Sequence, residues 1–270
     1  MRIRELTSPT NSLVKVFRRA LAEGATREGW LAVEGPHLVE EALEAASTAT
    51  IHSVLVSESA MVKFAGLLKR LSPETEIAQV ADKLFRQVAD TQNPQGIAGL
   101  VELARANLED ILQRRDVLLV VACGLQDPGN LGTILRSAEA FGASALVTLE
   151  NTVSPFNPKA VRASAGAIFR IPVVPKIKAE NLVERLRASR VSIIAAERSS
   201  PQTIEKANLC GPAALLIGRE AAGLPEEITR HADLRLSIPI RTGTDSVNAA
   251  TAASILLYES ARQRGFRYSY

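Results

Sequence analysis

The chain has 270 residues, enough for one large or two modest domains, and its hydrophobic content of 46% allows a full core. Its 32 basic residues nearly balance its 29 acidic ones, and the net charge of +3 permits a nucleic-acid partner without requiring one. No apolar run approaches the roughly 18 residues of a membrane span, and residues 1–12 lack the apolar segment of a signal peptide. We therefore expect neither a span nor a leader.

The two cysteines, Cys123 and Cys210, both lie in apolar segments. This placement predicts two buried, reduced thiols and a cytoplasmic protein. The histidine, cysteine and acidic residues do not follow the spacing of metal ligands, so no metal site is expected.

The first hundred residues alternate between helical and strand patterns. Asn11 or Ser12 is expected to cap a first helix whose apolar positions face the core. Strands are expected at residues 30–35, 51–57, 76–80 and 95–101, and helices at 36–46, 60–71 and 82–88. The alternation predicts a small α/β domain over residues 1–103 and a charged, helix-prone linker over residues 104–115.

The start of the chain is rich in basic side chains. They are Arg2, Arg4, Lys15, Arg18 and Arg19. One interpretation is a solvated helix face, and the other is a surface that contacts phosphate groups.

The second half, residues 116–270, repeats the α/β alternation. Residues 116–123 form a continuous apolar run, which is typical of a strand in a parallel sheet covered on both faces. Asn130 is expected to cap a helix over residues 131–141 that Gly142 ends. On that helix Gly132 and Arg136 are predicted to face away from the core. Arg136 can then hold an anionic or polar ligand, or it is an ordinary exposed arginine.

Two further strands each end in a polar loop. The run at 213–217 leads into Gly218-Arg-Glu-Ala-Ala-Gly223, and Leu234–Ile238 leads through Pro239 to Ser246-Val247-Asn248 and a helix of small residues. Ligands of open α/β sheets bind at such strand ends. The spacing is not that of a dinucleotide or Walker phosphate loop. Between these regions, Ser154–Ala167 is rich in small residues that allow close approach of backbone or a second subunit.

Four segments together resemble the SpoU/TrmH family of RNA 2′-O-ribose methyltransferases in the SPOUT superfamily. They are residues 130–136, 154–167, 218–223 and 238–248, in this order and with these separations. The phrases WLAVEGPHLVEEAL and NPQGIAGLVE give a weaker resemblance to the L30e-like substrate-binding domain often fused to that family. The resemblance implies a trefoil knot in the C-terminal α/β domain, a homodimer, and S-adenosylmethionine as cofactor.

The resemblance also implies roles for individual residues. Cofactor binding is implied for Leu216, Ile217, Gly218, Gly223, Ile238, Pro239 and Val247. At position 247 the family commonly has leucine, so the valine is a mild departure from its pattern. Catalytic roles are implied for Asn130, Arg136, Glu220, Ser246 and Asn248. Lys159 and Arg162 share a helical face and join the basic residues of the N-terminus as candidates for RNA binding.

Three functions remain open at this point. The favoured one is a methyltransferase acting on ribosomal RNA, with transfer RNA as the alternative substrate. The others are a non-catalytic RNA-binding or assembly protein that keeps the fold, and a methyltransferase with another substrate. Arg136 is either the proton acceptor or only a stabiliser of negative charge. The second role suits a guanidinium better, because this group stays protonated near neutral pH.

Overall fold

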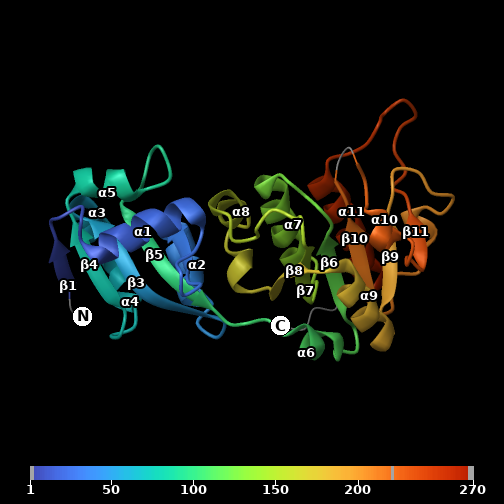
Figure 1. Cartoon of the computed structure of the whole chain (residues 1–270), viewed down its shortest axis with the longest axis horizontal. Helices are drawn as coiled ribbons and strands as arrows, with labels where there is room; N and C mark the ends of the chain where they lie inside the picture. Colours follow the sequence, from blue (N-terminus) through green and yellow to red (C-terminus); the bar gives the residue numbers. More distant parts are fainter. Residues whose placement is uncertain (1–2, 220–221, 267–270) are drawn as a thin grey trace. The chain divides into compact units, whose positions relative to one another are not determined.

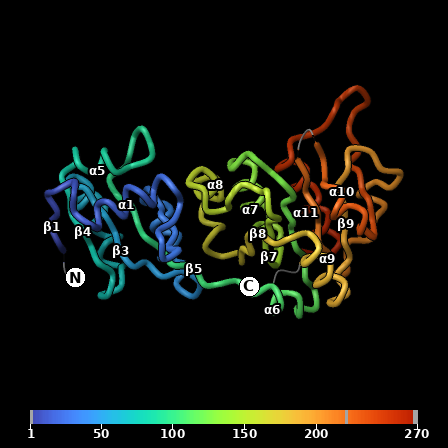
Figure 2. Tube along the Cα trace, in the orientation of Figure 1, coloured from blue at the N-terminus to red at the C-terminus, as the bar shows by residue number. Residues whose placement is uncertain are grey.

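The computed structural model describes residues 3–219 and 222–266, and the chain divides into two compact units. The first unit comprises Met1–Ala104 together with Phe156–Arg170, and the second comprises Arg105–Pro155 and Ile171–Tyr270. The sequence-based division differs from this grouping in two places, since residues 156–170 belong to the first unit and residues 105–115, expected as a linker, belong to the second. As a statement about folding domains the division stays a prediction. Figures 1 and 2 show the elements and the path of the chain.

A five-stranded mixed sheet forms the centre of the first unit, in the order β1-β4-β3-β5-β2. β1 and β3 run parallel to β4, whereas β5 runs antiparallel to β3 and β2. The strands are β1 (Ile3–Leu6), β2 (Leu31–Glu34), β3 (Ala49–Ser57), β4 (Glu76–Val80) and β5 (Ile97–Leu103). The helices are α1 (Ser12–Glu23), α2 (Pro36–Glu44), α3 (Glu58–Lys63), α4 (Ala65–Arg70), α5 (Asp82–Val88), α8 (Pro158–Ala163) and the 3-10 turn η1 (Ala167–Phe169).

Both faces of this sheet are covered, because its strands carry apolar residues on both sides. One face packs against α1 and α5 through a cluster that includes Phe17 and Phe85. On the other face a Cβ on Gly99 would lie 3.3 Å from Val33 of β2 and 3.6 Å from Val39 of α2, so α2 packs close to the sheet there. The small α/β fold expected for this part of the chain is therefore present.

Details of this unit depart from the sequence-based expectation. The strand β1 was not expected, since it is four residues long and only Leu6 is buried. The helix expected over residues 60–71 is two short helices that meet at Phe64. Asn11 caps α1 as predicted, with its side chain accepting from the amide of Leu13 at 2.9 Å. Val16, expected in the core, is 38% exposed.

Within the first unit, the segment Phe156–Arg170 packs against residues 1–104 through main-chain and side-chain contacts. The hydroxyl of Thr48 donates to the carbonyl of Phe169, and Arg170 forms an ion pair with Glu41. Gly24 has a φ of 98°, and a Cβ at this position would collide with the carbonyl of Phe156. This close approach of two backbone segments depends on Gly24, which lies outside the small-residue segment Ser154–Ala167.

Six parallel strands form the sheet of the second unit, in the order β11-β9-β10-β6-β7-β8. The strands are β6 (Leu118–Ala122), β7 (Ala145–Leu149), β8 (Val173–Ile177), β9 (Ser192–Ala196), β10 (Ala213–Ile217) and β11 (Leu234–Leu236). The helices are α6 (Leu108–Leu112), α7 (Pro128–Ala140), α9 (Ala179–Ala188), α10 (Glu226–Thr229), α11 (Ala249–Gln263) and the 3-10 turn η2 (Ile204–Lys206).

The central strands β6, β7 and β10 are buried along their whole length, as their continuous apolar sequences predict. Helices α6, α9 and α10 pack on one face of the sheet around a cluster that includes Leu182 and Ile228. The helices α7 and α11 pack against each other, joined by a hydrogen bond of 2.8 Å between the hydroxyls of Ser137 and Ser254. No helix of the described residues is long and apolar enough to cross a membrane.

Three expectations for the second unit are wrong. Asp127, not Asn130, caps α7, since its carboxylate accepts from the amide of Asn130 at 2.7 Å and Pro128 starts the helix. Gly132, expected to face away from the core, is buried. Cys210 is exposed because it lies in the turn before β10, whereas Cys123 at the end of β6 is fully buried.

Candidate active site

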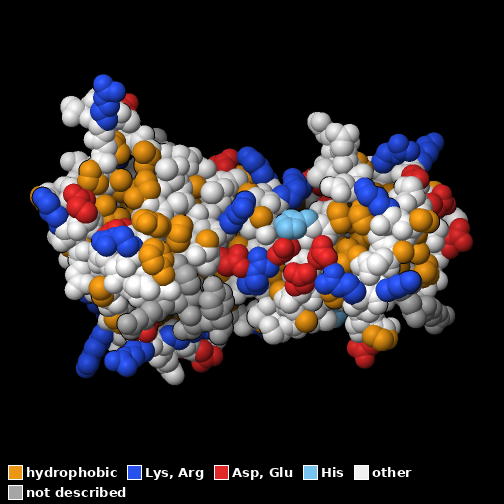
Figure 3. All heavy atoms as spheres, turned by 180° about the vertical axis from the view of Figure 1, so that it is seen from behind, with side chains coloured by type: hydrophobic (Ala, Val, Ile, Leu, Met, Phe, Trp, Pro, Cys, Tyr) orange, Lys and Arg blue, Asp and Glu red, His pale blue; other side chains and the backbone are white. Residues whose placement is uncertain are grey.

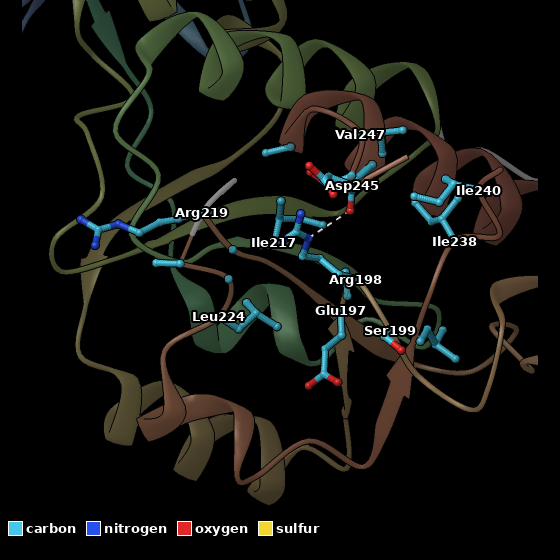
Figure 4. A pocket seen from close by; sticks show the side chains of 18 of the residues that line it. Glu197, Arg198, Ser199, Ile217, Arg219, Leu224, Ile238, Ile240, Asp245 and Val247 are labelled. Carbon is cyan, nitrogen blue, oxygen red and sulfur yellow. Dashed lines mark hydrogen bonds between the residues drawn. The ribbon is translucent and has the colours of Figure 1, made fainter. Parts of the chain in front are cut away.

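A cavity of about 430 Å³ lies where the chain leaves the carboxyl ends of β9, β10 and β11. Its volume falls in the range of roughly 300–1,000 Å³ that cofactor sites occupy. Apolar side chains form much of the lining (Figure 4), namely Ile217, Leu224, Leu236, Ile238, Ile240 and Val247. Because the strands are parallel, these loops must emerge at the same edge of the sheet, as the sequence predicted.

The loop after β10 closes on itself at the edge of this cavity. The amide of Arg219 donates to the carbonyl of Gly223, and the amide of Gly223 donates to the carbonyl of Arg219, both at 3.0 Å. A Cβ on Gly218 would lie 2.5 Å from the carbonyl of Gly223 and 2.7 Å from the amide of Leu224. Only glycine fits at 218, and the constraint comes from the protein's own backbone.

Hydrogen bonds tie this loop to the loop that follows β6. Nε of Arg219 donates to the carbonyl of Gly124 at 2.8 Å, and the amide of Cys123 donates to the carbonyl of Ile217, also at 2.8 Å. Gln126 donates from its side chain to the carbonyls of Gly124 and Asn151 at 2.9 and 2.7 Å. Three strand-end loops are therefore held as one rigid set.

The two asparagines predicted to act in catalysis contact each other. Nδ2 of Asn248 donates to Oδ1 of Asn130 at 3.0 Å. Oδ1 of Asn248 caps α11 by accepting from the amides of Ala250 and Thr251 at 2.8 and 3.3 Å. Because the cap fixes the Asn248 amide group, its Nδ2 points to α7, and the starts of α7 and α11 are joined beside the cavity.

Arg136 does not line the cavity. It is exposed on α7, one residue before Ser137, which binds α11. Its guanidinium makes no ion pair with the residues the structure describes. The structure thus places it on the helix that carries Asn130, with its charge available to a ligand.

The residues predicted to bind the cofactor divide into two groups. Ile217, Gly218, Gly223, Ile238 and Val247 line the cavity, and the predicted catalytic residue Ser246 lines it as well. Leu216 is fully buried within β10, and Pro239 is exposed beside the cavity without lining it. Glu220 lies outside the described residues. The functional roles of all these residues remain predictions.

Sequence reasoning missed the contribution of β9. Glu197, Arg198 and Ser199 follow this strand and line the cavity, as does Asp245 from the loop before α11. The sequence does contain a pattern that could have identified these residues, since the mainly apolar run 192–196 is followed directly by polar residues. What the sequence did not reveal is that β9 lies between β10 and β11, which brings its end into the same cavity.

The basic residues predicted to bind RNA are partly engaged in ion pairs. Arg4 pairs with Glu76 at 3.3 Å, Arg19 with Glu23 and Arg162 with Asp90, both at 2.8 Å. Figure 3 shows acidic and basic side chains next to one another on the face it presents. Lys15 and Lys159 are exposed, and Arg2 lies outside the described residues. Each of these pairs occupies one nitrogen of the guanidinium, so the other N–H donors can still contact a phosphate.

Arg18 differs from the other basic residues of α1. Its Nε atom is buried and has no hydrogen-bond partner among the residues that the structure describes. The guanidinium is therefore held partly against the protein, while the residue as a whole keeps intermediate exposure.

The two thiols do not suggest a metal site or a nucleophile. Complete burial raises the pKa of the Cys123 thiol, so it remains protonated. Cys210 is distant in sequence from other thiols and is unpaired. Among the described residues no group of three or more histidine, cysteine and acidic side chains is arranged to hold a metal ion.

Known proteins resemble this chain over most of its length. A 23S rRNA (guanosine(2553)-2′-O)-methyltransferase of Bacillus subtilis, RlmP, is 30% identical over 95% of this chain and 98% of its own. A 23S rRNA (uridine(2479)-2′-O)-methyltransferase of Streptomyces viridochromogenes is 31% identical over 75% of this chain and 72% of its own. The crystal structure of the SpoU methyltransferase AviRb from Streptomyces viridochromogenes, in complex with AdoMet, matches with a TM-score of 0.83 and 28% identity, covering 94% of this chain and 98% of AviRb.

Family models match both units. The MRM3-like substrate binding domain matches residues 17–99, and the SpoU rRNA Methylase family matches residues 117–258. The second match alone covers more than half of the chain and includes the cavity, α7 and most of α11. The chain belongs to the SpoU rRNA methylase family.

Proposed function

We propose that this chain transfers a methyl group from S-adenosylmethionine to a ribose 2′-hydroxyl of ribosomal RNA. The observation that carries the proposal is the cavity at the ends of β9, β10 and β11, built around the closed loop at Gly218. It is supported by relatives that span most of the chain and are named as 23S rRNA 2′-O-methyltransferases. These relatives modify different nucleotides, a guanosine and a uridine, so no particular nucleotide is proposed here.

The lining of the cavity fits this cofactor. Ile217, Ile238 and Val247 offer an apolar surface for an adenine ring, and Gly218 lets the loop close tightly at the edge of the cavity. When bound, the cofactor supplies a methyl group on a positively charged sulfur. Ser246 and the Asn130–Asn248 pair lie at or beside the cavity and can position the ribose. Positioning of two reactants contributes at best about 7–11 kcal/mol to lowering a barrier.

We propose that Arg136 stabilises the negative charge that develops on the ribose oxygen. A fixed cation beside a developing oxyanion is a strong source of catalysis. A guanidinium is a poor proton acceptor near neutral pH, because it stays protonated there. Arg136 does not line the cavity of its own chain, so we infer that a second copy brings its α7 to this cavity.

The homodimer has support from exposed aromatic side chains. Tyr258 on α11 is 49% exposed and Phe266 is 44% exposed, and their rings lie 5.9 Å apart. In the small-residue stretch Ala249–Ser254, Ala249, Ala250 and Ala253 are buried within their own chain, whereas Thr251 is exposed and Ala252 and Ser254 are half-buried. We also propose a cytoplasmic location, which fits two free cysteines and a ribosomal RNA substrate.

The first prediction concerns the closed loop. Gly218→Ala places a Cβ 2.5 Å from the carbonyl of Gly223, so the loop must open and the cofactor site must deform. We expect calorimetry to show at least about tenfold weaker binding of S-adenosylmethionine, a loss of about 1.4 kcal/mol. Gly211→Ala is the matched control, because its Cβ meets nothing within 4 Å. Unchanged affinity in the Gly218 variant would refute the assignment of this cavity to the cofactor.

The second prediction concerns Arg136. Arg136→Ala should keep the cofactor affinity and lower the rate of methyl transfer by about two orders of magnitude or more, as removal of an oxyanion-stabilising group does. Arg136→Lys should not restore the rate, because lysine lacks the planar fork of donors. Arg115→Ala, an exposed arginine in the turn before β6, is the control. Full activity of the lysine variant in single-turnover assays would contradict the proposed role.

The third prediction concerns the dimer. Sedimentation at micromolar concentration should give twice the mass of the chain. After mixed refolding, the inactive Gly218→Ala and Arg136→Ala variants should regain part of the activity, since a mixed dimer contains one site with both native residues. A monomer would exclude the shared site, and a dimer whose mixture stays inactive would show that each chain completes its own site.

The fourth prediction concerns RNA binding by α1. Replacing Lys15, Arg18 and Arg19 with glutamine should weaken RNA binding. The logarithm of the binding constant should also fall less steeply with the logarithm of the salt concentration, because each lost phosphate contact reduces this slope by about 0.7–0.9. Cofactor affinity should not change. Neutralising Lys63, Lys69 and Arg70 on α3 and α4 is a control of equal charge. A salt slope equal to that of the unmodified protein would assign the α1 residues to a solvated face.

The same measurements separate the remaining functions. A non-catalytic RNA-binding protein would bind RNA with the predicted salt dependence and fail to bind S-adenosylmethionine. An enzyme for transfer RNA would methylate purified transfer RNA and leave 23S ribosomal RNA unmodified. Mapping 2′-O-methyl groups in both RNAs after incubation with the protein distinguishes these outcomes.

A further inference from the structure

The cavity contains charged side chains that the proposed mechanism does not use. Among its described lining residues the cations are Arg198, which follows β9, and Arg219, which follows β10. In Figure 4 the side chain of Arg219 extends away from the other labelled residues, whereas Arg198 lies among them between Ile217 and Asp245. Nε of Arg219 is bound to the carbonyl of Gly124. Arg198 is therefore the cation that faces the interior of the cavity.

Arg198 is anchored at one atom and otherwise unpaired. Its Nε donates to the main-chain carbonyl of Asp245 at 3.1 Å, the contact drawn as a dashed line in Figure 4. The neighbouring carboxylate of Glu197 does not neutralise it, because Glu197 pairs with Arg235 at 3.1 Å. Its two terminal nitrogens make no hydrogen bond or ion pair with other residues in the described part of the chain.

This arrangement presents a fork of donors to whatever fills the cavity. A guanidinium carries five N–H donors, and the bond from Nε uses one of them. The remaining four lie on two coplanar nitrogens, a geometry that matches the two oxygens of a carboxylate. Because the Asp245 carbonyl fixes the position of Nε, the fork is oriented before the ligand arrives.

We propose that Arg198 binds the α-carboxylate of the methionine part of S-adenosylmethionine. The inference rests on the proposed function, because it needs the cofactor in this cavity. The carboxylate is the one anionic group of that molecule, whose sulfur and amino group are both cationic. The apolar residues Ile217, Ile238 and Val247 suit the adenine instead, so the ligand has one charge-matched orientation.

The same side chain would link cofactor binding to the loop before α11. Asp245, whose carbonyl holds Arg198, is followed by Ser246, Val247 and the helix cap Asn248. A carboxylate on the terminal nitrogens restricts the guanidinium further, and the bond from Nε passes this restraint to the loop. Carboxylate recognition would thereby order the residues next to the reacting ribose.

The test compares two ligands that differ in the carboxylate. S-adenosylhomocysteine has the complete amino-acid part, whereas 5′-methylthioadenosine keeps the adenine, ribose and sulfur and lacks that part. Calorimetry on the full chain should show that Arg198→Ala weakens S-adenosylhomocysteine binding at least tenfold and changes methylthioadenosine binding less than about threefold. Arg198→Lys should lie between, because it retains the charge without the fork.

Arg241→Ala is the matched control. Arg241 is an exposed arginine of the loop between β11 and α11, the loop that contains Asp245, and it does not line the cavity. It should leave both affinities unchanged. Equal losses for both ligands in Arg198→Ala would overturn the inference and assign Arg198 to holding the loop alone. Unchanged ligand affinities with weaker RNA binding would also overturn it, in favour of a phosphate contact. Failure of the unmodified protein to bind either ligand would instead refute the proposed function.

Discussion

The parallel register of the six-stranded sheet is the constraint on which the site depends. Ile217 aligns with Ala122, and Ala122 aligns with Thr148, so β10, β6 and β7 end at one level. Leu236 aligns with Ala196, which brings β11 and β9 to the same edge. Because all these strands run parallel, the chain leaves each of them at this edge, and the loops that follow share the space there. Three sets of contacts hold these loops around the cavity. They are the closed turn at Gly218, the hydrogen bond from Arg219 to Gly124 and the Asn130–Asn248 contact.

Much of this was predictable from local patterns. The continuous apolar runs identified β6 and β10, and the segments Gly218–Gly223 and Ser246–Asn248 marked the two loops that matter most. Such features depend on residues close in sequence, which is why periodicity and capping preferences detect them. The error at α7 has the same origin, because Asp127 and Asn130 are both good caps, and the choice between them depends on Pro128 fixing the first turn.

The remaining features depend on contacts between residues distant in sequence. Nothing near Arg198 reveals that β9 is inserted between β10 and β11, and so its place in the cavity could not be predicted. Strand β1 is defined by pairing with β4, more than 70 residues later, rather than by its own sequence. The burial of Gly132 follows from the packing of α7 on α11. The resemblance to a family supplied the cofactor and the reaction, and the C-terminal knot that it implies stays a prediction.

The placement of Phe156–Arg170 limits how freely the two halves of this protein can be recombined. The segment lies within the stretch that matches the methylase family, and within the first unit it packs against residues 1–104 through Thr48, Glu41 and the glycine at 24. Its residues Val161, Ile168 and Phe169 are almost completely buried. A gene fusion that exchanged the first hundred residues for another RNA-binding module would leave part of this apolar surface without its cover. Inheritance of the two units as one piece is therefore favoured over modular exchange, and any replacement module must reproduce the surface that receives this segment.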